Sequence, residues 1–183
     1  MAEFFDEAVR KPLLAHVPSW IHPNHLTVAR AAFLVPLVLV RNSPFWAISV
    51  VTLSSLCDLL DGPLARNRGQ VSQDGATLDA TCDKVFNLGA ILFACWGLIP
   101  YGIAIAVIAL DLVLAGIRPV KRRRGIKTDA NAYGGAKVWL QSLGIGFALY
   151  RAAWSDMLVV PLFGLAIVAA VLSLAGHIRD FAR

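Results

Sequence analysis

The chain has 183 residues, of which 57% are apolar and only 16% are charged, and its net charge is +5. A soluble domain carries about 25% charged residues, and one of this length has too little interior to bury so much apolar surface. These values exclude a soluble globular protein and also a disordered chain, whose mark is low hydrophobicity, and they predict a polytopic membrane protein.

Residues 1–22 combine apolar side chains, such as Phe4 and Phe5, with the charges of Asp6 and Glu7. This mixture predicts a short amphipathic helix that lies on the membrane surface. No apolar core of the signal-peptide type occurs in the first 20 residues, so we expect no cleavable signal peptide. The region is therefore interpreted as an interfacial segment that precedes the membrane-spanning part.

Six apolar stretches follow, and each is predicted to be a transmembrane helix because about 20 residues span the hydrocarbon core. We therefore expect an all-α fold, with the interfacial segment at 1–22 and a six-helix transmembrane domain at 23–183. The stretches run over residues 26–40, 45–64, 76–99, 101–119, 133–154 and 157–177.

The basic residues indicate the orientation of these helices. Six helices place both termini on one side, and of the 17 Lys and Arg residues all but Arg41 and Arg151 fall on that side or in the helix halves facing it. The positive-inside rule then places both termini and the loops 67–75 and 120–132 in the cytoplasm, in a cytoplasmic (inner) membrane. The basic run 121–124 fits this orienting role, with binding of an anionic head group as the alternative. Topology explains the positive charge without nucleic acid as a partner.

Four aspartates stand out because they lie at the ends of apolar helices. Asp58 and Asp61 are separated by three residues, and Asp79 and Asp83 by four, so each pair shares one face of its helix. A short loop joins the two helices and makes them antiparallel neighbours. The four carboxylates are therefore predicted to converge near the cytoplasmic end.

Such a cluster needs cations. A charged residue at mid-membrane costs roughly 2.5–3.5 kcal/mol, and neighbouring carboxylates repel one another. Oxygen ligands without His or Cys favour Mg²⁺ or Mn²⁺, and two such ions form a clamp for phosphoryl transfer. The alternatives are a set of carboxylates paired with Arg30, Arg66 and Lys84, or a path for ions or protons.

Small and basic residues between the two pairs favour a phosphate ligand. Arg66 lies about two turns from Asp58 and can hold a phosphate through two hydrogen bonds. Gly62, Ala65 and Gly75 have little or no side chain, so a ligand can approach the backbone closely.

The stretch from Asp58 to Asp83 resembles the signature of the CDP-alcohol phosphotransferase family, D-x₂-D-G-x₂-A-R-x₈-G-x₃-D-x₃-D, at every fixed position. Residues 23–30, Pro-Asn-His-Leu-Thr-Val-Ala-Arg, resemble the upstream P-N-x-[LIV]-T-x-x-R segment of the same family. Within the family, the sequence is most similar to phosphatidylglycerophosphate synthases.

The resemblance implies an enzyme that passes the phosphatidyl group of CDP-diacylglycerol to a small alcohol and releases CMP. It also implies two divalent cations, Mg²⁺ or Mn²⁺, at Asp58, Asp61, Asp79 and Asp83, with Asp83 as the general base. A homodimer in contact with membrane lipids is expected. The implied CDP-lipid contacts are Asn24, His25, Leu26, Thr27, Gly62, Ala65, Arg66, Ser72 and Gly75.

The acceptor alcohol is less closely specified. Segments 109–118 and 134–141 resemble regions of phosphatidylglycerophosphate synthases, which favours glycerol-3-phosphate, although Gly135 and Val138 replace the Lys and Thr of that pattern. Inositol phosphate or a second phospholipid is the alternative acceptor.

Two cations are candidates for the acceptor phosphate. Arg118 and Lys137 lie at the predicted cytoplasmic ends of the fourth and fifth helices, where interfacial snorkelling is their alternative role. Two other classes of protein also place aspartates in membranes: a prenyltransferase that acts on a diphosphate, and an acid-lined transporter or channel.

Overall fold

The computed structural model describes residues 17–124, 132–152 and 154–181. These residues are helical apart from short connections, and no β-strand occurs among them beyond an isolated bridge between Trp96 and Ile99. The all-α prediction is confirmed. The amphipathic helix predicted within 1–22 falls largely on residues 1–16 and so lies outside the described residues.

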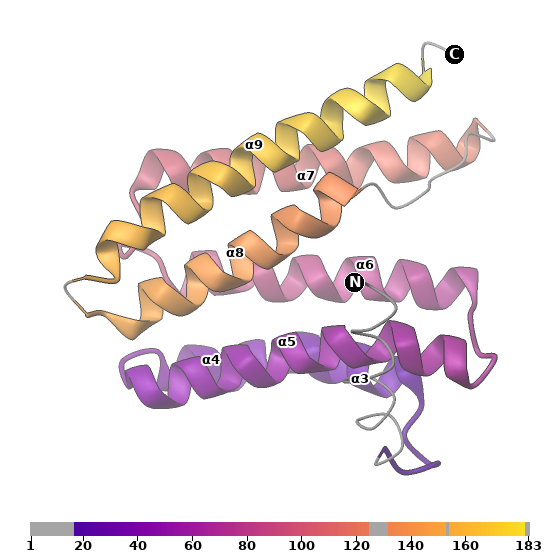
Figure 1. Cartoon of the computed structure of the whole chain (residues 1–183), viewed down its shortest axis with the longest axis horizontal. Helices are drawn as coiled ribbons and strands as arrows, with labels where there is room; N and C mark the ends of the chain where they lie inside the picture. The colour runs from indigo at the N-terminus through magenta and orange to yellow at the C-terminus, as the bar shows by residue number, and fades with distance from the viewer. Residues whose placement is uncertain (1–16, 125–131, 153, 182–183) are drawn as a thin grey trace, which may run out of the picture.

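The helical segments follow the predicted apolar stretches in order (Figure 1). Because α4 follows α3 directly and the π-helical turn η2 follows α6, the segments pair with the six stretches one to one. They are α3 (Pro23–Ala32), α4 (Leu34–Val40), α5 (Pro44–Asn67), α6 (Gln73–Gly89), η2 (Ala90–Ala94), α7 (Tyr101–Arg123), α8 (Ala132–Tyr150) and α9 (Asp156–Phe181).

The boundaries differ from the predicted ones at two places. The third helix ends at Ala94 instead of continuing to residue 99, because Gly97 adopts a φ of 84° and Pro100 follows. The fifth ends at Tyr150 instead of residue 154, because Arg151 has a φ of 56° that no helix accommodates.

The first predicted membrane span is interrupted, and the sequence did not predict this interruption. Helix α3 ends at Ala32 and α4 begins at Leu34, with Phe33 between them. Pro36 explains this position, because it has no N–H to donate to the carbonyl of Ala32.

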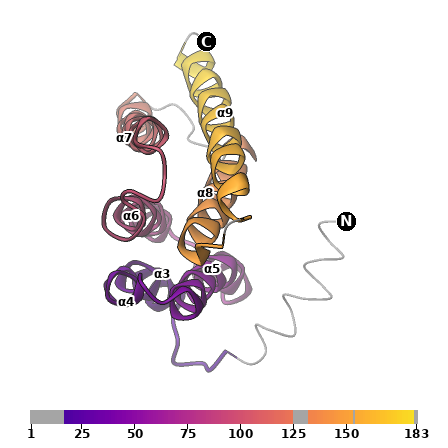
Figure 2. The same cartoon turned by 90° about the vertical axis from the view of Figure 1, so that its left-hand side faces the viewer.

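The helices pack as two groups, α3 to α6 and α7 to α9, and the two groups meet along α5 and α8 (Figure 2). Helix α3 contacts α5 and α6, and α9 contacts α7 and α8. At the α8–α9 contact, a Cβ on Gly144 would lie 2.8 Å from the ring of Phe163, so only glycine permits this approach. The apolar core between the groups includes Leu37, Val51, Phe86, Ile91, Ile145, Leu149 and Phe163.

Among the described residues, three helical segments are long and apolar enough to cross a membrane: Pro23–Val40, Pro44–Asn67 and Met157–Arg179. Large apolar side chains cover the outside of the bundle, such as Leu39, which is 80% exposed. An apolar outer surface suits contact with lipid tails. The other three predicted membrane spans remain predictions.

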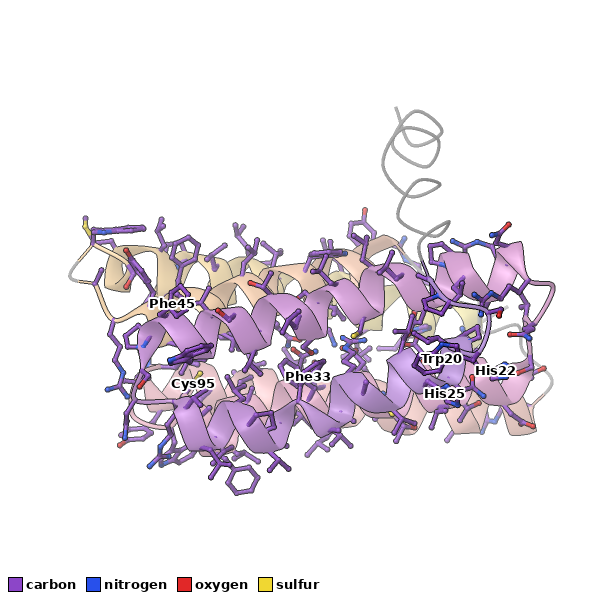
Figure 3. All side chains as sticks on the ribbon, turned by 90° about the horizontal axis from the view of Figure 1, so that it is seen from below. Trp20, His22, His25, Phe33, Phe45 and Cys95 are labelled. Carbon is purple, nitrogen blue, oxygen red and sulfur yellow. The ribbon has the colours of Figure 1, made fainter. Side chains whose placement is uncertain are left out.

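The two ends of the bundle carry different residues. Trp20, His22 and His25 lie at one end, and Phe45 and Cys95 lie toward the other (Figure 3). The first of these ends also holds the turn between α5 and α6, so it is the end at which the aspartate pairs meet (Figure 1).

The chain that leads into α3 is fixed to this end by Arg68. Its guanidinium donates to the carbonyl oxygens of Val17 at 3.1 Å and Pro18 at 3.0 Å, and also to that of Ile21. These bonds join the start of α3 to the end of α5 and position α3 beside the aspartates.

Candidate functional site

The turn between α5 and α6 sets the relative position of the two aspartate pairs. Ser72 begins α6 as its N-cap, and its Oγ accepts a hydrogen bond of 3.0 Å from the backbone N–H of Gly75. Side-chain capping of this kind satisfies N–H groups that have no partner within the helix. The turn is short, so α5 and α6 run antiparallel and bring Asp58 and Asp61 opposite Asp79 and Asp83.

Three of the four carboxylates form a compact group. One oxygen from each of Asp58, Asp61 and Asp79 lies within 4.8 Å of the others. Oδ1 of Asp79 is buried and has no hydrogen-bond partner among the described residues. The guanidinium of Arg30 lies near this oxygen without a hydrogen bond to it, and the all-oxygen set of the three aspartates suits a hard divalent ion. The residues present therefore fit the predicted metal.

Helix α3 supplies the donors to this group. Oγ1 of Thr27 donates to Oδ2 of Asp61 at 2.9 Å. The guanidinium of Arg30, with only 3% of its side chain exposed, donates to both Asp58 and Asp83. It also lies 3.6 Å from Oδ1 of Asp79.

Asp83 is held differently from the other three aspartates. Besides the bond from Arg30, Oδ1 of Asp83 accepts a hydrogen bond of 2.6 Å from Nδ2 of Asn87, one turn further along α6. Asn87 is 1% exposed, and its own Oδ1 is buried with no hydrogen-bond partner in the described part of the chain. Both donors use the same oxygen of Asp83, which fixes the direction of the carboxylate.

Arg30 and Asn87 were missed as site residues by the sequence reasoning. Arg30 entered only as the last position of the 23–30 segment and as a partner of the carboxylates in an alternative interpretation, and Asn87 did not enter. A signal existed for Asn87, because a position four residues after Asp83 shares its helix face. No local spacing relates Arg30 to α5 and α6.

Three of the predicted CDP-lipid residues lie together beside the carboxylates. A Cβ on Gly75 would lie 3.0 Å from Oγ of Ser72 and 3.5 Å from Oδ1 of Asn24. On α5, a Cβ on Gly62 would lie 3.7 Å from Nη1 of Arg66, whose side chain is exposed. Glycine at these two positions keeps the space beside polar groups open.

The remaining predicted CDP-lipid residues are at the same end with different surroundings. The ring of His25 is exposed and packs edge-on against that of His22, with centroids 5.3 Å apart. Leu26 is half-buried on α3, and Ala65 is half-buried near the end of α5, where its carbonyl accepts a bond of 2.8 Å from the N–H of Gln70.

Lys137, a predicted acceptor residue, forms a buried ion pair. Its Nζ lies 2.6 Å from Oδ1 of Asp111 on α7, and Nε2 of Gln141 donates to Oδ2 of the same aspartate at 3.1 Å. Lys137 is 6% exposed and Asp111 is 2% exposed. Burial of the amine does not match interfacial snorkelling. The side chain of Arg118 lies outside the described residues.

Part of the basic run 121–124 also packs into the protein. Lys121 is 1% exposed, and its Nζ lies 3.2 Å from Nδ1 of His177 on α9. The guanidinium of Arg124 lies over the ring of Phe181, 5.4 Å from its centroid. These contacts join the ends of α7 and α9.

Comparison with known proteins gives a family match over most of the chain. Residues 20–176 match the family described as CDP-alcohol phosphatidyltransferase. The putative cardiolipin synthase of Mycobacterium tuberculosis is 31% identical over 117 residues, which are 62% of this chain and 56% of that protein. This match therefore spans about half of that relative. The CDP-diacylglycerol–glycerol-3-phosphate 3-phosphatidyltransferase of Bacillus subtilis is 28% identical over 167 residues, 81% of this chain and 86% of that protein.

Solved structures show the same fold. The phosphatidylinositol phosphate synthase of Mycobacterium tuberculosis with CDP-DAG bound has a TM-score of 0.68 at 21% identity, over 94% of this chain and 93% of that one. The same enzyme with manganese and citrate has a TM-score of 0.66 at 23% identity, over 94% of this chain and 87% of that one. The helical arrangement described above is thus shared along nearly the whole length.

Proposed function

Because the chain belongs to the CDP-alcohol phosphatidyltransferase family, we propose that it transfers the phosphatidyl group of CDP-diacylglycerol to a small alcohol. The acceptor oxygen forms a bond to the β-phosphorus, the bond from this phosphorus to the oxygen of CMP breaks, and the hydroxyl proton goes to the protein. The observation that carries the proposal is the group formed by Asp58, Asp61 and Asp79, with Asp83 beside it on α6. The resemblance seen in the sequence is thereby confirmed at the level of the family.

Asp58, Asp61, Asp79 and Asp83 would hold two divalent cations, Mg²⁺ or Mn²⁺. When bound, such ions neutralise the diphosphate and the charge that develops on it during transfer. Support comes from the all-oxygen ligand set, from the absence of a hydrogen bond to Oδ1 of Asp79 among the described residues and from the manganese in the related structure.

Asp83 is the proposed general base. Its Oδ1 already accepts hydrogen bonds from Arg30 and Asn87, so we assign the acceptor proton to Oδ2. A carboxylate whose direction is fixed in this way can take a proton from a hydroxyl without first reorienting.

The end of the bundle near Ser72 is the proposed site of the CDP moiety. Asn24, Ser72 and Gly75 converge there, and Gly62 leaves room beside the guanidinium of Arg66. Arg66 can hold a phosphate oxygen pair through two parallel bonds. The proposal also includes His25, Leu26, Thr27 and Ala65, which lie on the same stretches of α3 and α5.

The proposed acceptor is glycerol-3-phosphate, which gives phosphatidylglycerophosphate. The support is the Bacillus subtilis relative, which aligns over 81% of this chain, and the cations Arg118 and Lys137 on α7 and α8. To bind an acceptor phosphate, the ammonium of Lys137 would have to contact both the phosphate and the carboxylate of Asp111.

The ion pair between Lys137 and Asp111 favours a second candidate for the acceptor. Because Asp111 neutralises Lys137, the acceptor region carries less positive charge for a phosphate monoester than two unpaired cations would supply. A second phospholipid, whose phosphodiester has a single charge, then becomes the competing acceptor. The name of the mycobacterial relative, putative cardiolipin synthase, points the same way.

We propose that the domain at 23–183 spans the membrane six times, as a homodimer with both termini and the carboxylates on the cytoplasmic side. The distribution of Lys and Arg supports this orientation. CDP-diacylglycerol keeps its tails in the bilayer, which explains why the carboxylates lie at the end of apolar helices.

The test is CMP release by the purified chain with CDP-diacylglycerol, Mg²⁺ or Mn²⁺, and one acceptor at a time: glycerol-3-phosphate, inositol phosphate or phosphatidylglycerol. Release with glycerol-3-phosphate alone supports the first candidate, and release with phosphatidylglycerol alone supports the second. No release with any acceptor contradicts the proposal. Binding of a prenyl diphosphate in preference to CDP-diacylglycerol would favour a prenyltransferase, and ion flux in liposomes would favour a transporter.

A further inference from the structure

Arg68 is the C-cap residue of α5, and its side chain reaches the chain that leads into α3. The guanidinium donates to the backbone carbonyl oxygens of four residues in this stretch: Val17 at 3.1 Å, Pro18 at 3.0 Å, Ser19 at 3.4 Å and Ile21. The N–H of Ile21 also donates to the carbonyl of Pro18 at 3.1 Å, which closes a turn in the same stretch. One side chain therefore holds the backbone of residues 17–21 against the end of α5.

This use of its donors distinguishes Arg68 from Arg66, which lies two residues earlier. A guanidinium has N–H donors in a fixed plane and no acceptor. Both Nη1 and Nη2 of Arg68 donate to backbone carbonyls. The side chain of Arg66 is exposed instead and lies beside the open space at Gly62. Of these two arginines, Arg66 is therefore the one placed to bind a phosphate, whereas Arg68 fixes the backbone.

The stretch that Arg68 holds continues directly into two of the proposed CDP-binding residues. His22 is the N-cap of α3, and its backbone N–H lies 3.3 Å from Nδ1 of His25. Figure 3 shows both histidines at this end of the bundle. Asn24 lies between them in sequence, and its Oδ1 would be 3.5 Å from a Cβ on Gly75. The positions of Asn24 and His25 therefore depend on where the preceding stretch is held.

The proposed nucleotide site combines two parts of the chain. The start of α3 supplies Asn24 and His25, and the start of α6 supplies Ser72 and Gly75. The side chains of Asn24 and His25 are exposed, so burial does not fix them. Arg68 lies in the connection between α5 and α6 and hydrogen-bonds to the chain before α3, so it joins the two parts. A site that is already joined binds more tightly, because groups that must be ordered during binding reduce affinity.

We propose that Arg68 is a positioning residue for the nucleotide of the CDP-lipid. By holding residues 17–21 against the end of α5, it keeps Asn24 and His25 where they contact the nucleotide. Arg68 itself touches backbone carbonyls and not the ligand. This inference rests on the proposed function, which assigns the CDP moiety to this end of the bundle.

The experiment measures binding of CDP to the full chain in detergent with Mn²⁺, by titration calorimetry, and CMP-release kinetics on the same preparations. Arg68→Gln is expected to weaken CDP binding and to raise the KM for CDP-diacylglycerol, each on the order of tenfold, because the nucleotide must then order the start of α3. The kcat and the KM for the acceptor should stay near the wild-type values. Arg68→Lys should recover only part of the loss, since one ammonium cannot reach all the carbonyls that two guanidinium nitrogens reach.

Arg41→Gln is the matched control. Nη1 of Arg41 also donates to a backbone carbonyl, that of Phe93 at 2.6 Å, but from the end of α4. This variant should bind CDP as the wild type does. Hydrogen exchange gives a readout without ligand: peptides that cover residues 17–25 should exchange faster in Arg68→Gln than in the wild type and in Arg41→Gln. If Arg68→Gln does not fold, Arg68→Lys carries the same test with a smaller change in the same direction.

A double-mutant cycle distinguishes positioning from direct contact of Arg68 with a phosphate. If Arg68 acts through the start of α3, the losses of CDP affinity in Arg68→Gln and Asn24→Ala should be less than additive when the two changes are combined. Additive losses would show that Arg68 acts independently of Asn24 and would overturn the positioning role.

The other outcomes separate this inference from the proposed function. Equal CDP binding by the wild type and by Arg68→Gln, or an acceptor KM that rises as much as that for CDP-diacylglycerol, overturns the role of Arg68 and leaves the proposed function standing. Weaker CDP binding by Arg68→Gln without CMP release by the wild type supports the role of Arg68 and overturns the proposed transfer. No CDP binding and no CMP release by the wild type overturns both.

Discussion

Asn87 donates a hydrogen bond of 2.6 Å to Oδ1 of Asp83 from one turn further along α6. The bond is made at the buried side of the site, because Asn87 is 1% exposed whereas the Asp83 side chain is 17% exposed. Asn87, which is buried inside the protein, therefore holds the proposed base Asp83 in its orientation.

Asn87→Leu should lower turnover by about 10- to 100-fold, as loss of a supporting hydrogen bond typically does. The KM for CDP-diacylglycerol should change little, because Asn87 supports Asp83 and not the lipid. Stability should be preserved, since the unpartnered Oδ1 of Asn87 is removed as well. CMP-release kinetics and thermal unfolding measure both effects.

Ser54→Ala is the control for Asn87→Leu. Ser54 is equally buried on α5, and its Oγ has no partner among the described residues, but it does not contact Asp83. It should leave turnover unchanged. Equal losses in the two variants would contradict a specific role for Asn87.

Asp83→Asn should reduce turnover by about 10²- to 10⁴-fold, the usual contribution of a general base. Binding of CDP-diacylglycerol should change far less, because an amide keeps the size and one oxygen of the carboxylate. Asp74→Asn is the matched control, since Asp74 is exposed in the first turn of the same helix. Turnover near the wild-type value in Asp83→Asn would refute the assignment of the base.

The ion pair between Lys137 and Asp111 allows the structural role of Lys137 to be tested separately from its proposed role in acceptor binding. Lys137→Met leaves Asp111 as an uncompensated charge that is 2% exposed, and should destabilise the protein by about 3–5 kcal/mol. The double variant Lys137→Met with Asp111→Leu should recover most of this loss in a detergent unfolding experiment.

The double variant then tests the acceptor role. If Lys137 also holds an acceptor phosphate, the stable double variant should show a raised KM for glycerol-3-phosphate and an unchanged KM for CDP-diacylglycerol. An unchanged KM for both substrates would make the pair purely structural and would favour the phospholipid acceptor.

Gly75→Ala probes the proposed position of the CDP moiety. The added methyl would lie 3.0 Å from Oγ of Ser72 and 3.5 Å from Oδ1 of Asn24. Because the methyl would fill space that the CDP moiety uses, the KM for CDP-diacylglycerol should rise by about tenfold, which corresponds to about 1.4 kcal/mol. Gly102→Ala on α7 meets nothing within 4 Å and should leave this KM unchanged. If Gly75→Ala and Gly102→Ala have the same KM for CDP-diacylglycerol, the CDP moiety does not bind beside Gly75.

Local spacing predicted much of the site because helix geometry is periodic. The separations within Asp58–Asp61 and Asp79–Asp83 fix each pair on one face, and the short turn before Ser72 then leaves little choice but convergence. The N-cap Ser72 and the proline at position 23 are likewise local signals, each of which marks the start of a helix.

Contacts between distant helices were not predictable in this way. The position of Arg30 depends on how α3 packs against α5 and α6, which no spacing along the chain encodes. Lys137 was a candidate from the sequence, but its separation from Asp111 along the chain gives no sign that the two pair across α7 and α8. The early end of the third helix depends on the backbone angle of Gly97.

The same ion pair bears on how the protein enters a membrane. Asp111 lies near the middle of α7, which is one of the proposed membrane spans, and an acidic residue at the centre of a span opposes insertion of a lone helix by roughly 2.5–3.5 kcal/mol. Its partner arrives only with α8, which is synthesised later. In the proposed six-span topology, we therefore expect α7 to enter the lipid together with α8, so that Asp111 is paired with Lys137 during insertion.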